Sequence, residues 1–137
     1  MLEKLKQAAV NLAALDLERV ALQALRQNEQ AVLDFNREQL QDSFDREGEP
    51  LGEYASIAYA NMKGRITVDL KLTGGFYNAM YLKADEFPVL FDSRDEKTTE
   101  LKAKYGEEIF GTDKVNTERV AQQIVLPEVS KAILENI

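Results

Sequence analysis

The 137-residue chain contains no cysteine and no histidine, and both absences limit its chemistry. Without cysteine there is no disulfide framework and no thiolate, so nothing points to an oxidising compartment. Without histidine there is no Ser-His or Cys-His triad, no imidazole general base and no zinc site with nitrogen or sulfur ligands. The missing residues therefore exclude the commonest classes of hydrolase and zinc protein.

Positive charge is also scarce. Lysine and arginine number 17 against 24 aspartates and glutamates, so the formal net charge is −7. A protein that binds duplex DNA through its phosphates needs clustered lysine and arginine to release counterions. The acidic balance argues against simple binding to duplex DNA.

Long apolar runs are absent as well. Glu3, Lys4 and Lys6 interrupt the apolar residues of the N-terminus, so no signal peptide is predicted. No run approaches the roughly 18 residues that a membrane-spanning helix needs. We expect a soluble protein made in the cytosol, with a single core, because 137 residues are too few for two domains of ordinary size.

Proline and glycine are missing from residues 2–44, where strong helix formers dominate, and this composition predicts helix. The apolar spacing shifts near residues 15–17, where Asp16 can cap a second helix. The pattern fits either two helices or one long helix with a phase slip. Gly48 and Pro50 then predict the end of the helical segment.

A helix of about 29 residues from Leu17 would extend for roughly 43 Å, longer than a domain of this mass needs. Two interpretations of its apolar stripe stay open. The stripe either packs on the core of its own chain or is partly covered by a neighbouring chain. Its candidate assembly residues are Leu22, Leu25, Val32 and Phe44, together with Leu33 and Leu40.

The rest of the chain has a mixed character. Residues 53–62 fit a helical turn or a strand, and residues 65–72 fit a strand or an extended loop. The alternating residues of the second stretch that would enter the core are Ile66, Val68, Leu70 and Leu72.

A hairpin of two strands is predicted from residues 76–84 and 87–91. Helices are expected from a cap at Ser93 or Asp95 to Lys104, over residues 115–125, and from Pro127 to the C-terminus. The predicted fold class is α+β. A long N-terminal helical segment (residues 1–47) precedes residues 48–137, which hold a small antiparallel sheet and C-terminal helices in one folding unit.

The glycine pair after Thr73 does not match a nucleotide-binding loop. A phosphate-binding loop needs Lys-Ser or Lys-Thr after its last glycine, and a dinucleotide loop must open a helix. Neither requirement is met, because no lysine follows and residues 76–81 predict a strand. Gly74 is therefore predicted to bend the chain with a positive φ.

One candidate metal set exists, formed by Asp92, Glu100 and Lys102. Metal-dependent nucleases use an aspartate with a Glu-x-Lys element to hold Mg²⁺ and orient water. Residues 97–104 predict a helix, however, on which positions 100 and 102 diverge by about 200°. The acidic residues of 42–53 lack the order of a calcium loop. We therefore predict no cofactor, no metal and no catalytic residue.

Two glycines flank an aromatic anchor in the stretch from Tyr105 to Gly111. This pattern predicts a loop that inserts Phe110 into a pocket of its own domain or of a neighbour.

The order of these pieces resembles small head–tail joining and tail-completion proteins of tailed bacteriophages. The likeness covers residues 63–111 and rests on LKLTGGFY and KYGEEIFG, which are also similar to segments of uncharacterised phage and prophage proteins of gut Bacteroidota. The chain departs from the joining proteins in its long helical N-terminus, and in a second glycine where a hydrophobic residue often follows Thr-Gly.

The resemblance implies a non-enzymatic virion structural protein, assembled in the bacterial cytoplasm. It would form a ring or collar at the head–tail (neck or connector) position or at the tail-completion position. Its partners would be copies of itself and neighbouring phage proteins such as portal or tail proteins, with DNA passing through an acidic lumen without specific binding and no membrane. The residues that carry the likeness are Thr73, Gly74, Phe76, Tyr105, Gly106, Phe110 and Gly111.

Two other classes stay open. One is a Mg²⁺-dependent nuclease or hydrolase, and the other is a small regulatory module whose N-terminal helix binds in a partner's groove.

Overall fold

The computed structural model describes residues 1–71 and 74–137. Three helices form its N-terminal part: α1 (Leu2–Ala13), α2 (Leu17–Gln27) and α3 (Glu29–Gln41). Asp16 caps α2 as predicted, because its carboxylate accepts a hydrogen bond from the backbone N–H of Arg19 at 3.1 Å. The interpretation with a break at Asp16 is therefore confirmed.

A second break, which the sequence pattern did not predict, separates α2 from α3 at Asn28. The side-chain amide of Asn28 donates to the backbone carbonyl of Ala24 at 2.8 Å, and its backbone leaves the helical region with φ −116°. Asparagine disfavours helix interiors because its side chain competes for backbone hydrogen bonds. The prediction of one helix of about 29 residues is wrong for this reason.

The sheet is a hairpin of β1 (Met80–Lys83) and β2 (Leu90–Ser93), paired antiparallel with Met80 opposite Ser93. This confirms the predicted hairpin and the α+β class. The first strand begins later than predicted, because residues before it form a helical turn, α5 (Gly75–Asn78). Phe76 and Tyr77 are both buried, which neighbouring residues of a strand with one buried face cannot be.

The segment between α3 and α5 is mostly extended and contains one short helix, α4 (Ile57–Lys63). Of the two predictions for residues 65–72, the extended loop fits better than the strand. Among the described residues this segment makes one isolated β-bridge, between Glu53 and Thr67, and no continuous strand pairing. The predicted core residues divide: Val68 and Leu70 are buried, Ile66 is exposed, and Leu72 lies outside the described residues.

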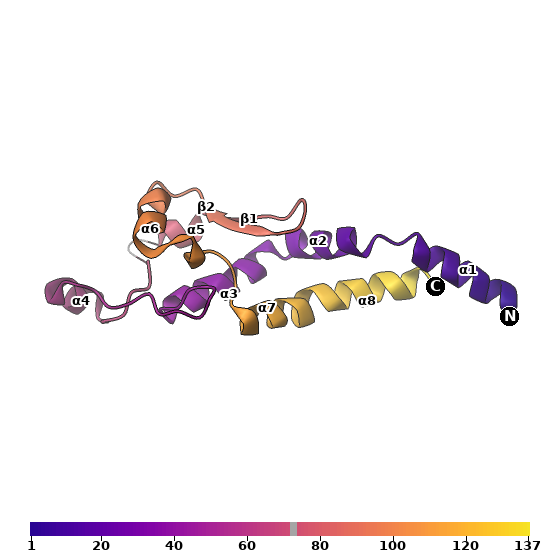
Figure 1. Ribbon diagram of the computed structural model, residues 1–137, viewed down its shortest axis with the longest axis horizontal. Helices are drawn as coiled ribbons and strands as arrows, with labels where there is room; N and C mark the ends of the chain where they lie inside the picture. Colours follow the sequence, from indigo (N-terminus) through magenta and orange to yellow (C-terminus); the bar gives the residue numbers. More distant parts are fainter. Residues whose placement is uncertain (72–73) are drawn as a thin grey trace.

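The C-terminal part begins with α6 (Thr98–Tyr105), which Gly106 ends as predicted with φ 90°. The turn η1 (Glu107–Ile109) follows. Then α7 (Lys114–Val120), the π-helical turn η2 (Ala121–Val125) and α8 (Leu126–Glu135) run as one rod alongside α2, so the two predicted helices join (Figure 1). Pro127 lies in the first turn of α8, where proline is tolerated.

The core is shared by α2, α3, α5, the hairpin, residues 109 and 110 and the C-terminal rod, and α1 contributes no buried residue to it. Its fully buried apolar residues include Leu33, Leu40 and Ile109. Leu22, Leu25 and Val32 are buried in the same cluster. The interpretation that their stripe needs a neighbouring chain is therefore wrong, because the chain covers these residues itself. Phe44 alone of the stripe stays exposed, at 43 %.

The molecule is elongated, with a helix projecting at each end (Figure 1). The helix α1 extends beyond α2 at one end, and α4 extends beyond α3 at the other. Within the described residues, no helix combines the length and the apolar character needed to cross a membrane.

Candidate assembly surfaces

The projecting helix α1 has an apolar face that its own chain leaves uncovered. None of its side chains, all of which the structure describes, is buried. Leu2 and Leu5 are 64 % and 62 % exposed, and Leu12 is 39 % exposed. An isolated helix of 12 residues is marginal in water, because most helical stability in proteins comes from packing. The face of α1 is therefore the first candidate contact surface.

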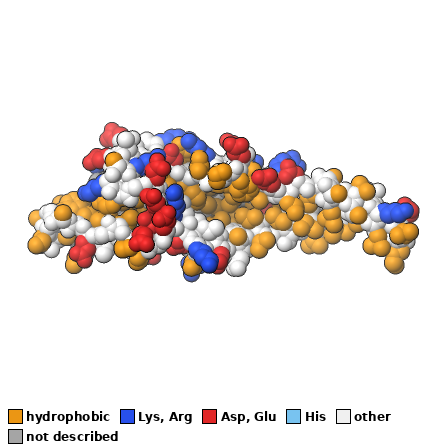
Figure 2. All heavy atoms as spheres, viewed as in Figure 1, with side chains coloured by type: hydrophobic (Ala, Val, Ile, Leu, Met, Phe, Trp, Pro, Cys, Tyr) orange, Lys and Arg blue, Asp and Glu red, His pale blue; other side chains and the backbone are white. Residues whose placement is uncertain are grey.

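An apolar groove lies between the hairpin and the C-terminal rod. Its volume is about 830 Å³, and most of its lining side chains are apolar. Ala21, Leu25 and Val32 contribute from α2 and α3, and residues 87–91 from the hairpin. The rod contributes Val120, Ala121 and Val125. Figure 2 shows hydrophobic side chains gathered beneath the hairpin and continuing along the helices toward the N-terminal end. This groove is the second candidate surface.

The α4 end carries a third apolar surface. Ile57 and Met62 are 80 % and 75 % exposed, and Ile66 beside them is also exposed. Such side chains at a projecting end indicate a place where another molecule can pack.

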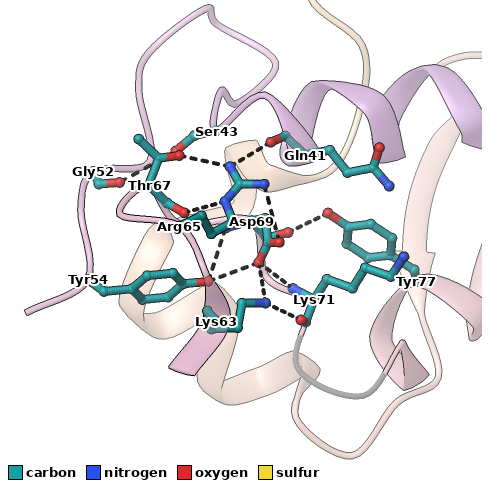
Figure 3. A network of polar contacts seen from close by, with 10 residues as sticks. All are labelled: Gln41, Ser43, Gly52, Tyr54, Lys63, Arg65, Thr67, Asp69, Lys71 and Tyr77. Carbon is teal, nitrogen blue, oxygen red and sulfur yellow. Dashed lines mark hydrogen bonds and ion pairs between the residues drawn. The ribbon is translucent and has the colours of Figure 1, made fainter. Parts of the chain in front are cut away.

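A buried carboxylate holds the α4 end on the body (Figure 3). The Oδ1 atom of Asp69 accepts hydrogen bonds from the Lys63 ammonium at 2.9 Å and from the Tyr54 hydroxyl at 2.9 Å. Arg65 approaches the Oδ2 atom at 3.4 Å. The hydroxyl of Tyr77 donates to the backbone carbonyl of Asp69. These contacts tie α4, the extended segment and α5 together.

The pKa shifts of Asp69 and Lys63 indicate that this cluster has a structural role. Burial raises the pKa of the Asp69 carboxyl, but hydrogen bonds from Lys63, the Lys71 amide and Tyr54 outweigh it, and the pKa lies below its ordinary 3.8. Burial lowers the pKa of Lys63, while the bond to Asp69 outweighs it and the pKa lies above 10.5. Burial also raises the pKa of Tyr77. A carboxylate with a depressed pKa is a weak base at neutral pH, so the cluster stabilises rather than moves protons.

The predicted metal set does not assemble. Asp92 on β2 and Lys102 on α6 come together as an ion pair, with Oδ1 and Nζ 3.5 Å apart. Glu100 lies on the exposed side of α6, whose helical geometry agrees with the prediction. Across residues 1–71 and 74–137 no group of three acidic side chains is placed to hold a metal ion.

The other predicted residues are structural within this chain. Gly74 has φ 85° and is the N-cap residue that precedes α5, and Thr73 lies outside the described residues. Phe110 is buried in its own domain, where the centroid of its ring lies 5.5 Å from the ring centroid of Phe76. The sequence pattern allowed Phe110 to insert either into its own domain or into a neighbouring chain. In the structure it is buried in its own chain. Tyr105 packs half-buried against the same core.

Two buried polar residues of α3, which sequence reasoning missed, hold the loop around Gly111. Asn36 donates to the carbonyl of Ile109 and accepts from the N–H of Gly111, each at 2.9 Å. Gln39 donates to the carbonyl of Gly111 at 3.1 Å and accepts from the N–H of Asp113 at 2.7 Å. The sequence could have indicated this role, because Asn36 and Gln39 lie on the face of α3 that carries its apolar core residues. A buried polar group on that face is costly unless it finds a hydrogen-bond partner.

No family model matches the chain, and neither the curated proteins nor the solved structures contain a match to it.

Proposed function

We propose that the chain is a non-enzymatic structural subunit of a tailed-bacteriophage virion. It forms part of a ring or collar at the head–tail or tail-completion position. The observation that carries the proposal is an elongated molecule with uncovered apolar side chains on both projecting helices, α1 and α4. A subunit of a ring needs two different contact surfaces, one for each neighbour.

The energetics support repeated contacts. Full burial of a leucine, isoleucine or methionine side chain stabilises a contact by about 1.5 to 3 kcal/mol. Leu2, Leu5, Ile57 and Met62 are each more than half exposed, so a neighbour that covers them gains a large share of that free energy. The same gain recurs at every subunit of a closed ring.

The charge of the chain fits a ring through which DNA passes. With a net charge of −7, carboxylates outnumber ammonium and guanidinium groups on its surface. Phosphates in a lumen lined by such subunits meet like charge, so DNA slides without binding.

A second candidate is a small regulatory module that inserts α1 into the groove of a different protein. The exposed apolar face of α1 favours this function as well. A Mg²⁺-dependent hydrolase receives no comparable support, because Asp92 is paired with Lys102 and Glu100 stands apart.

Immunogold labelling of purified particles tests the proposal. Antibodies against the chain are expected to label the junction between head and tail. Labelled protein confined to the host lysate, with unlabelled particles, contradicts the virion assignment and favours the regulatory module. Detergent-opened particles serve as the control for an epitope hidden inside the ring.

A further inference from the structure

We propose that the outer edge of β2 binds an extended segment of a different protein as a third strand of the sheet. The bound segment lies in the apolar groove between the hairpin and the rod. Its chemistry is an alternation of apolar residues with an acidic residue near one end. The inference goes beyond the proposed function, since this contact does not depend on where in a particle the chain is located.

The hydrogen bonds of the hairpin show which backbone groups face outward. The N–H of Arg94 donates to the carbonyl of Ala79 at 3.0 Å, so these two residues form a hydrogen-bonded pair. Hydrogen-bonded and non-hydrogen-bonded pairs alternate along an antiparallel ladder, so Leu82 and Phe91 form a non-hydrogen-bonded pair. The backbone N–H and C=O groups of both residues therefore point away from the partner strand.

Side chains of α2 and α3 close the outer edge of β1. The N–H of Leu82 donates to the carboxylate of Glu29 at 3.1 Å. The guanidinium of Arg26 donates to the carbonyl of Ala84, directly after the strand, at 2.6 Å. The body of the protein thus occupies the edge of β1, and no further strand can pair there.

The outer edge of β2 is open where it faces the groove. Across residues 1–71 and 74–137, the outward backbone groups of Phe91 have no hydrogen-bond partner, and neither do those of Val89. The edge closes at Ser93, whose carbonyl accepts from the Thr98 hydroxyl at 3.2 Å. Residues 87–92 all line the groove, so the open edge and the groove form one site. Unpaired groups in a row on a strand edge are a template for another strand.

The groove has room for the side chains of an added strand. Side chains alternate between the two faces of a strand, so every second residue of the segment would enter the groove, on the side where Val89 and Phe91 pack on the core. The remaining residues would face solvent beside Leu90, which is 52 % exposed. Figure 2 shows the hydrophobic side chains beneath the hairpin on which the segment would lie. A segment that matches residues 87–92 extends for about 20 Å.

The charges of the groove select an acidic segment. Arg46, Lys83 and Lys102 line it against Asp92 and Glu107, a net charge of +1. Asp92 and Lys102 pair with each other at 3.5 Å. Lys83, at the end of β1 opposite Leu90, forms no ion pair with any carboxylate of the described residues. An acidic residue at this end of the segment supplies the missing partner.

The same charges disfavour a second copy as the occupant. Pairing of two β2 edges would bring one net-positive groove against another. The chain's own extended segment over residues 65–71 is already held in place, because Val68 and Leu70 are buried and Asp69 pairs with Lys63. A different protein that carries a free extended segment is therefore the partner that fits.

Selection from a random peptide library by ribosome display, with the full chain as bait, tests the site. Enriched peptides are expected to alternate apolar residues and to carry aspartate or glutamate near one end. Their synthetic forms should bind Ala121→Trp several-fold more weakly than the parent, because the new ring fills the groove. The matched control is Gln123→Trp, which is exposed on the same rod but does not line the groove.

Two further measurements test the mode of binding. Methylation of single backbone nitrogens in the tightest peptide should weaken binding about tenfold at every second position, because alternate N–H groups point to β2. Lys83→Glu should weaken binding of the acidic peptide several-fold, and lysine in place of the peptide's acidic residue should restore it. Lys83→Glu also decides the question if Ala121→Trp fails to fold.

Four results would overturn the proposal. They are the absence of enriched peptides, equal binding to Ala121→Trp and Gln123→Trp, methylation effects without a period of two, and a parent dimer that Ala121→Trp dissociates. The last of these would assign the edge to a second copy. None of them changes the labelling of particles, so the contact and the virion function can fail separately.

Discussion

At the scale of single residues, hydrogen bonds from buried polar side chains fix the conformation of the irregular segments of this protein. Asn36 and Gln39 satisfy the backbone around Gly111, and Asp69 gathers Tyr54 and Lys63 around one carboxylate. Each such group is costly if it loses its partner, because burial has removed its water. These residues therefore stabilise irregular segments whose backbone makes no regular helix or sheet hydrogen bonds.

Asp69→Asn is expected to lower the free energy of unfolding by about 3 kcal/mol, because it leaves the Lys63 ammonium without its counter-ion. The folded-state pKa of Asp69 is depressed, so its contribution is present above the ordinary value of 3.8 and is lost as the pH falls through the lower folded-state pKa. Urea denaturation between pH 2 and pH 7 should show this loss in the parent and not in the variant.

Asp34→Asn is the matched control for that experiment. Asp34 also pairs with an arginine, Arg37, at 3.0 Å, but its side chain is 61 % exposed. Solvent screens such a pair, and its removal should change stability by less than about 1 kcal/mol. Equal losses in the two variants would contradict the role assigned to Asp69.

Gly74→Val is expected to destabilise the fold by about 1 to 2 kcal/mol, because an L-residue is strained at φ 85°. Among the described residues a Cβ at this position would meet the Asn78 side chain, at 3.7 Å, which is ordinary van der Waals contact. The cost therefore arises in the backbone rather than from a clash with these residues. Thermal and urea melts measure it. Gly74→Asn should lose less, since asparagine tolerates this conformation. A Val variant as stable as the parent would show that the bend does not need glycine.

At the scale of elements, the sequence predicted those whose signals are local. The Asp16 cap, the Gly106 stop and the hairpin each depend on a few neighbouring residues, and the structure contains all three. The break at Asn28 and the turn α5 were missed. Helix-forming neighbours surround Asn28, and the burial of both Phe76 and Tyr77 depends on distant core partners rather than on local pattern.

The candidate surfaces were predicted only in part. For the stripe of Leu22, Leu25 and Val32 the sequence left two interpretations open, the core of its own chain or a neighbouring chain, and the structure buries it in the core of its own chain. Periodicity identifies an apolar face but does not say which chain covers it. The uncovered faces lie instead on α1 and α4, and finding them required the tertiary arrangement.

Leu5→Glu and Leu33→Ala separate these two kinds of surface. Leu33 is fully buried, so Leu33→Ala should cost about 2 to 5 kcal/mol of stability. Leu5 is exposed, so Leu5→Glu should leave the unfolding free energy nearly unchanged while weakening self-association in analytical ultracentrifugation. If Leu5→Glu destabilises the monomer as strongly as Leu33→Ala, α1 belongs to the core and is not a contact surface.

At the scale of the whole molecule, we expect no nuclease activity. Among the described residues the acidic side chains form no metal-holding group, and Asp92 is engaged by Lys102. Incubation of linear and circular DNA with Mg²⁺ or Mn²⁺ should give no cleavage by the parent, and Glu100→Ala should behave identically. Metal-dependent cleavage that disappears in Glu100→Ala would establish the hydrolase instead.

The central claim, that the chain is a repeated structural subunit of a phage particle, is tested most directly by its copy number. Isotope-dilution mass spectrometry on purified particles measures that number against a capsid protein of known count. The account predicts a fixed integer greater than one, the same in every preparation, as a ring requires. Fewer than one copy per particle, or a number that varies between preparations, would contradict it.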